Sequence, residues 1–444
     1  MKKMNIYFCG LAACMLAMAS CTDNFDETNT NPNKITVSSG KLEASAMFEQ
    51  TLYGSANFFT YYSWFWCDEL IQHTAHTGGT TRQEHRYFIG DQNWKALWNT
   101  YLRYASNDVN MIKLAEAQGA SYLQAVGLTM KVLFMSNLTD IYGDIPYKEA
   151  FMAEEGIKQP VFDSQENVYQ QMCAELEEAN RIYASKPYVE EKNRKLDGMY
   201  NFDMTKWQKF NNSLYLRLLC RISGRKETIV DGTHNVAQKI TEIVHSQETY
   251  PIFEGNEDNA TVHYTGIAPY TSEFDNANYT ESSFTTGSYK LTEQMIKMMV
   301  IKDATNTKVD LYTDPRLPII GRKKREYWAG TIAGATMGEE SNNGDKNAAY
   351  LNNKLLCRNN CDEWFMDYAE VEFILAEAAL KGLIPGGETV AKTHYEKAIT
   401  ASLQKWSDFA SPVDPTLAIT TEGIQTFLNS GLASWDQANT QEAK

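Results

Sequence analysis

The body of the sequence has no hydrophobic run long enough to cross a membrane. The one uninterrupted apolar stretch, residues 6–19, lies at the extreme N-terminus and is too short to span a bilayer core of about 30 Å as a mature helix. Basic residues are also scarce: 41 Lys and Arg face 56 Asp and Glu, a formal net charge of −15. Such a charge repels phosphate backbones and anionic headgroups. We therefore expect neither a polytopic membrane protein nor a nucleic-acid partner.

Common catalytic and metal-binding signatures are missing too. The sequence contains no CxxC pair, no Cys/His zinc spacing, no GxSxG elbow and no GxxxxGK[ST] loop. His73 and His76 lack the Glu of an HExxH zinc helix, and the oxygen-rich runs at 255–264 and 342–347 do not follow the EF-hand pattern. We therefore predict no catalytic residue, no metal and no cofactor. Carboxylates are plentiful, however, so composition leaves a glycoside hydrolase open.

The 444 residues are 43% hydrophobic and 12% aromatic, enough for one or two substantial cores. From about residue 41 onward the apolar spacing is helical. A capping box is predicted at Asp163 to Glu166. Apolar stripes indicate helices at 94–102, 122–134, 168–183, 207–218, 368–378 and 395–403. The last two form an antiparallel pair typical of a tetratricopeptide unit. Two polar regions, 254–290 and 321–361, interrupt this pattern and are candidate functional loops.

The N-terminus has the features of a secretory signal. Lys2 and Lys3 precede the uncharged stretch 6–19. Residues 16–20 and the cysteine that follows resemble the lipobox of bacterial lipoproteins. We expect a signal peptide at 1–20, an acylated Cys21 and a flexible tether over 21–40. An ordinary signal with Cys21 incidental is the alternative.

Five further cysteines remain after Cys21: Cys67, Cys173, Cys220, Cys357 and Cys361. An odd count excludes a complete disulfide framework. Cys357 and Cys361 could pair within one loop, and buried free thiols account for the others.

Aromatic residues provide the case for ligand binding. A sugar presents a C–H-rich face edged by hydroxyls, so its site needs flat rings and nearby amides or carboxylates. Rings without fixed charge suit a neutral ligand. The run at 58–66 and the loop aromatics supply candidates, although core packing explains the helical run and loop packing could explain the others. The candidate ligand-binding residues are Trp64, Trp66, Asp68, Gln72, Tyr270, Phe274, Asn276, Tyr279, Tyr327 and Trp328.

Five segments together resemble the SusD/RagB family of nutrient-binding outer-membrane lipoproteins. They are NTNPN at 29–33, DIYGDIPYKEAF at 140–151, WQKFNNSLYLRLLCRISGR at 207–225, DPRLP at 314–318 and YAEVEFILAEAALKG at 368–382. The resemblance implies an all-α fold of tetratricopeptide-like helix pairs, over 41–444 as a single domain, with long irregular loop insertions forming the ligand surface. Family members usually continue beyond a position equivalent to Lys444, so we expect either truncation or divergence at the C-terminus.

The resemblance also implies a partner and a location. The partner is a SusC-like TonB-dependent β-barrel transporter, and the location is the outer membrane, lipid-anchored and facing the exterior. We expect capture of a glycan or oligosaccharide and its transfer to that transporter. The alternatives are a tetratricopeptide-type scaffold or peptide-binding lipoprotein and, third, a surface glycoside hydrolase. In DIYGDIPY we interpret Asp140 and Asp144 as turn residues that bond local amides, not as a catalytic pair.

Overall fold

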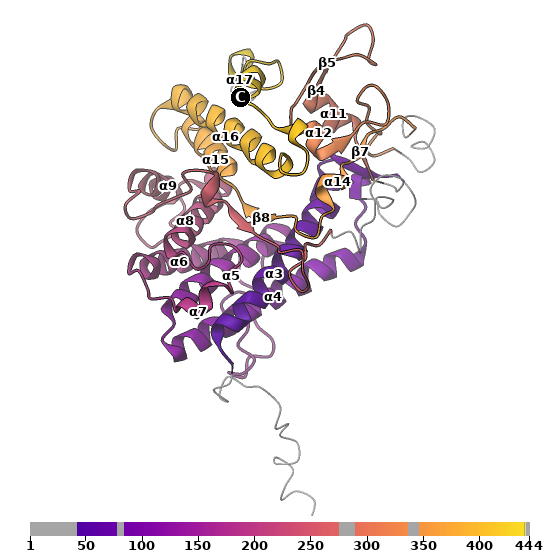
Figure 1. Ribbon diagram of the computed structural model, residues 1–444. Coiled ribbons are helices and arrows are strands. Elements are labelled where there is room, and N and C mark those ends of the chain that lie inside the picture. Colours follow the sequence, from indigo (N-terminus) through magenta and orange to yellow (C-terminus); the bar gives the residue numbers. More distant parts are fainter. Residues whose placement is uncertain (1–41, 78–83, 275–288, 336–345, 439, 441–444) are drawn as a thin grey trace, which may run out of the picture. The chain divides into compact units, whose positions relative to one another are not determined.

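Helical hairpins make up most of the chain (Figure 1). The computed structural model describes residues 42–77, 84–274, 289–335, 346–438 and 440. Its helices of eight or more residues are α3 (Ala44–Tyr62), α4 (Asp91–Gln118), α5 (Ser121–Tyr142), α6 (Gln165–Ala184), α8 (Met204–Arg221), α9 (Val236–His245), α15 (Tyr368–Leu380), α16 (Gly387–Ala410) and α17 (Thr421–Leu428). The shorter ones are α7 (Glu191–Arg194), α11 (Glu293–Met299), α12 (Leu317–Ile320) and α14 (Asn353–Leu356).

Helices α4 and α5 form the first long hairpin. Gly119 ends α4 in the left-handed region at φ +68°, and α5 begins two residues later. At Gly127 of α5 an added Cβ would lie 2.6 Å from Cγ1 of Ile112 on α4. Glycine at this position therefore allows the two helices to pack closely.

Helices α6 and α8 pack on α5 and extend the stack. Trp207, Phe210, Leu214 and Leu218 are fully buried, so the stripe predicted for this helix is confirmed. The cap predicted for α6 is shifted: Ser164, not Asp163, accepts the N–H of Asn167. The reason is that Asp163 instead accepts the backbone N–H groups of residues 147 and 148.

A buried polar network links α5, α6 and α8. Asn211 accepts a hydrogen bond from the Thr129 hydroxyl at 2.8 Å and donates to the Leu176 carbonyl at 3.0 Å. Asn212 donates to the Asn180 side chain at 3.0 Å. Because buried amides are costly to leave unpaired, these contacts specify how the three helices align.

The C-terminal hairpin, α15 and α16, joins the stack through α8. Arg217 of α8 forms two 2.6 Å contacts with the Glu370 carboxylate of α15. Gly382, at φ +70°, follows α15 and leads to α16. Figure 1 shows the hairpins arranged from α3 and α4 to α15 and α16. The predicted mainly α-helical architecture is confirmed.

Short antiparallel strands come from the segments between hairpins. They are β1 (Thr74–His76), β2 (Ala260–Val262), β3 (Tyr289–Leu291), β4 (Val300–Lys302), β5 (Asp310–Thr313), β6 (Gly321–Arg322), β7 (Tyr350–Leu351) and β8 (Glu363–Met366). One sheet has the order β1-β3-β7-β6, and β2 pairs with β8 and β4 with β5. The first sheet places the residues that follow α3 beside two loop regions distant in sequence.

The segment DIYGDIPY has a structural role. Gly143, at φ +76°, ends α5, and Asp144 accepts the backbone N–H of Gln165 at 2.9 Å. The prediction that Asp140 bonds a local amide differs from the structure, in which Asp140 accepts the Tyr169 hydroxyl at 2.5 Å and pairs with Arg221. These contacts tie the end of α5 to α6 and α8.

The five cysteines of the described region are all free thiols, Cys67 exposed and the other four buried. Cys357 and Cys361 therefore do not form the disulfide that their spacing would permit.

Among the described residues, no helix combines the length and apolar character needed to traverse a bilayer.

Candidate functional site

A cavity of about 310 Å³ lies where α3, the first sheet, β8 and α16 meet. Its apolar wall combines aliphatic side chains with five aromatic rings: Trp64, Phe274, Trp364, Trp406 and Phe409. Its polar wall groups are Thr60, Asp68, His73, Thr74, Cys361 and Asp362. Apolar walls with a few polar side chains are the usual composition of a small-molecule site.

Trp64 reaches the cavity because the chain changes its winding after α3. Residues Ser63–Asp68 form a π-helical turn, a feature often found at functional sites. The Trp64 ring contacts Phe274 edge-to-face, with centroids 5.0 Å apart, and Tyr289 at 4.6 Å. These contacts hold the indole at the wall.

The opposite group of rings comes from β8 and the end of α16. Trp406 and Phe409 are three residues apart on α16, with centroids 5.5 Å apart and ring planes at 85°. Trp364 contacts Phe409 at 5.6 Å. Lys405 lies over Trp364 and Trp406, and its ammonium is 2.5 Å from Asp367. The ring arrangement is therefore braced by both edge contacts and a paired cation.

Asp68 and Asp362 are the acidic groups of the cavity. Asp68 lines the cavity, and burial of its carboxyl raises its pKa to about 7. Its Oδ1 lies 3.8 Å from Nδ1 of His73, whose own pKa burial lowers. Asp362 lies 3.1 Å from Nδ1 of His263 and raises the pKa of that imidazole through a hydrogen bond.

Three of the predicted site residues, Trp64, Asp68 and Phe274, meet in this cavity. Gln72 lies instead in a separate recess of about 400 Å³ with residues of α11. Its side-chain amide donates to the His85 carbonyl at 3.0 Å.

The other predicted residues lie elsewhere. Trp66 and Trp328 are only 5% and 3% exposed, so core packing leaves little of either ring for a ligand. The Tyr270 hydroxyl donates to Glu49 at 2.8 Å, and Lys302 lies over the Tyr327 ring at 5.4 Å. Asn276, Tyr279 and Cys21 lie outside the described residues.

Among the lining residues that the sequence did not predict are one acid and three rings: Asp362, Trp364, Trp406 and Phe409. The i, i+3 spacing of Trp406 and Phe409 placed both on one helical face and was a usable signal. Nothing local indicated that Trp364 of β8 would join them.

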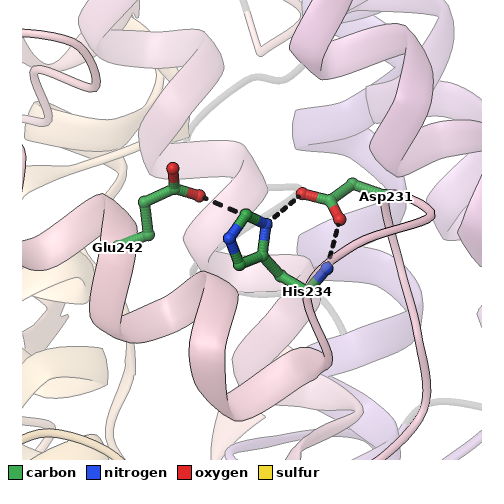
Figure 2. A group of neighbouring side chains, drawn as sticks. All are labelled: Asp231, His234 and Glu242. Carbon is green, nitrogen blue, oxygen red and sulfur yellow. Dashed lines mark hydrogen bonds and ion pairs between the residues drawn. The ribbon is translucent and has the colours of Figure 1, made fainter.

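A second cluster of ligand-type atoms lies beside α9 (Figure 2). Asp231, His234 and Glu242 each offer an atom, all within 4.8 Å of one another. The ammonium of Lys239 is 2.7 Å from Asp231 and 2.6 Å from Glu242. Burial opposes its charge, but hydrogen bonds with Asp231, Glu177 and Glu242 outweigh burial and raise the Lys239 pKa. The lysine therefore supplies the cation that these carboxylates require.

The fold and the cavity define the class of protein: an all-α scaffold of stacked helical hairpins with an aromatic recess of small-molecule size. The chain belongs to the SusD-like family, described as starch-binding and associating with the outer membrane, whose model matches residues 32–444.

Solved structures share this fold at low sequence identity. A SusD homologue from Bacteroides fragilis is 21% identical with a TM-score of 0.72, covering 91% of this chain and 81% of that one. A SusD homologue from Parabacteroides distasonis is 20% identical with a TM-score of 0.70, covering 87% and 75%. A chitin-binding SusD homologue from Flavobacterium johnsoniae is 19% identical with a TM-score of 0.64, covering 82% and 70%. The chain matches none of the curated proteins with which it was compared.

Proposed function

We propose that this protein binds a glycan without cleaving it and that the aromatic cavity holds one part of that glycan. The observation that carries the proposal is the convergence of five rings from four separate regions of the chain on one cavity of about 310 Å³. The family description, starch-binding, and the chitin-binding homologue support a saccharide ligand. A volume at the lower end of known ligand pockets, roughly 300–1,000 Å³, suits a short stretch of a sugar chain.

Isothermal titration with a panel of oligosaccharides tests this proposal, using protein that lacks residues 1–21. Trp406→Ala should weaken binding of the best ligand by about tenfold or more, which corresponds to about 1.4 kcal/mol. Tyr188→Ala is the matched control, since this ring is 82% exposed and is not part of the cavity. Thermal melting checks that both variants are folded.

Two outcomes would contradict glycan capture. The first is an absence of binding across the whole panel, and the second is a Trp406→Ala variant with unchanged affinity. Release of reducing ends by the pure protein would instead support the glycoside hydrolase alternative.

We also propose that Cys21 carries the lipid anchor on the outer membrane and that the bound glycan passes to a SusC-like TonB-dependent β-barrel transporter. The lipobox-like residues 16–21 and the family description support this proposal. Cys21→Ser should move the protein from the membrane fraction to the soluble fraction. Co-purification of the wild-type protein with a β-barrel from detergent extracts tests the partner.

A further inference from the structure

The cavity has an electrostatic property that a site for a neutral sugar does not need. Asp68 and Asp362 both line it, with 41% and 35% of their side chains accessible. Among the described residues that form its wall, none is Lys or Arg. His73 adds no charge near neutral pH because burial lowers its pKa. Burial raises the Asp68 pKa to about 7, so this carboxyl is only partly ionised at neutral pH, and a ligand ammonium beside it would favour the charged form. The described lining therefore combines aromatic rings with carboxyl groups and has no Lys or Arg.

Rings and carboxylates together recognise organic cations. The negative face of an aromatic ring attracts an ammonium group, and a nearby carboxylate adds a charge-assisted hydrogen bond. Three of the cavity rings already have cations over them: Lys405 at Trp364 and Trp406, and Arg358 at 4.8 Å from Phe409. Neither basic residue forms part of the lining, and Lys405 is paired with Asp367. Asp362 already pairs with His263 at 3.1 Å, so Asp68, which lies 3.8 Å from Nδ1 of His73, is the carboxyl that a ligand ammonium would pair with.

A metal ion suits this lining less well than an organic cation does. Calcium takes six to eight oxygen ligands, and magnesium demands an octahedral oxygen shell. The cavity offers two carboxyl groups and two threonine hydroxyls among bulky rings. An organic cation can contact the rings through its C–H groups and pair with the carboxyl groups through its ammonium.

Resting on the proposed function, we infer that the cavity selects an amino sugar with a free ammonium group over neutral sugars. The sugar ring would stack on the indoles, as proposed for any glycan, and the ammonium would lie between the rings and the carboxylates of Asp68 and Asp362. This inference differs from the neutral ligand that the aromatic residues alone suggest.

The test compares three tetramers by isothermal titration at pH 7: glucosamine, N-acetylglucosamine and glucose. The first carries amines that are protonated in part at pH 7, and the other two are neutral chains of similar shape. We expect the glucosamine tetramer to bind at least tenfold more tightly than either neutral tetramer. In the double variant Asp68→Asn, Asp362→Asn, this ratio should fall to about one. Asp436→Asn, a change at an exposed acid paired with Lys392, should leave the ratio unchanged.

The outcomes separate this inference from the proposed function. Equal binding of all three tetramers, or a double variant that keeps the preference, would overturn the amino-sugar inference while glycan capture stands. Failure of every tetramer and of the wider panel would overturn both. A lysine-rich peptide that binds as tightly as the glucosamine tetramer would also overturn the amino-sugar inference, since the site would then recognise the ammonium group without the sugar ring.

Discussion

The indole of Trp64 meets the Phe274 ring nearly at a right angle, with centroids 5.0 Å apart and planes at 86°. Trp64 belongs to the π-helical turn after α3, whereas Phe274 lies between β2 and β3. Phe274 is 8% exposed and packs in the same core cluster against which Trp64 rests. One wall of the cavity therefore depends on a contact between segments that are distant in sequence.

We expect this contact to matter for ligand affinity. Phe274→Ala should weaken binding of the best glycan, because Trp64 loses the ring that orients it. Trp64→Ala should weaken it by at least as much. The double variant should lose less than the sum of the two, since residues in contact are non-additive by about 0.5–3 kcal/mol. Isothermal titration of the four proteins measures the coupling, and strict additivity would show that Phe274 does not orient Trp64.

Glu363 should make stability depend on pH. It is 3% exposed, accepts the Tyr264 hydroxyl at 2.8 Å, and burial raises its pKa to about 8. In the unfolded chain the pKa of the Glu363 carboxyl is about 4.3. Between these values the folded state holds a proton that the unfolded state has released, so its contribution to stability is lost as pH rises toward 8. The slope is at most about 1.4 kcal/mol per pH unit.

Glu363→Gln should flatten this pH dependence. Glutamine keeps the size and the acceptor of the side chain but has no proton to lose. Urea unfolding at pH 5, 6, 7 and 8 gives the free energies. Glu422→Gln, at an exposed position, is the control and should keep the wild-type slope. An unchanged slope in Glu363→Gln would mean that this carboxyl titrates normally.

Lys239→Ala should destabilise the fold by about 3–5 kcal/mol, the usual cost of leaving one side of a buried ion pair uncompensated. The side chain is 2% exposed and contacts Glu177, Asp231 and Glu242. Lys392→Ala, which breaks an exposed pair with Asp436, should cost no more than about 1 kcal/mol. Chemical denaturation compares the two.

The Lys239→Ala variant should also gain a response to divalent cations. Without the ammonium, the atoms of Asp231, His234 and Glu242 remain within 4.8 Å of one another. Zinc or manganese should then raise the melting temperature of Lys239→Ala, reversibly with a chelator, and leave the wild type unaffected. An equal response of both proteins would argue against the lysine as the internal cation.

Asp197→Ala should be among the most destabilising single changes. The carboxylate accepts the backbone N–H groups of Met199, Tyr200 and Phe202 and, at 2.8 Å, the indole N–H of Trp207. Removing it leaves several buried donors unpaired, each at about 1–3 kcal/mol. Asp203→Ala, which removes only the cap of α8, should cost about 1 kcal/mol. Similar losses for the two variants in thermal denaturation would contradict this account.

The sequence by itself determined α4, α5, α6, α8, α15 and α16, since apolar spacing along one helix is a local property. The sequence predicted the stripe from Trp207 to Leu218 because side chains three or four residues apart lie on the same face of a helix. Gly119 after α4 and Gly382 after α15 adopt the left-handed region, which glycine allows without steric cost.

Only the tertiary structure decided which rings form the cavity. The run at 58–66 offered several rings at similar spacing, and the π-helical turn decided that Trp64 lines the cavity while Trp66 packs in the core against Trp94. Trp364, on a three-residue pairing between β2 and β8, and Trp406, near the end of α16, meet only after the whole stack has formed. The orientation of a ring depends on the side chains that pack around it. Here those side chains come from segments far apart in the sequence, and their contact cannot be predicted from local spacing.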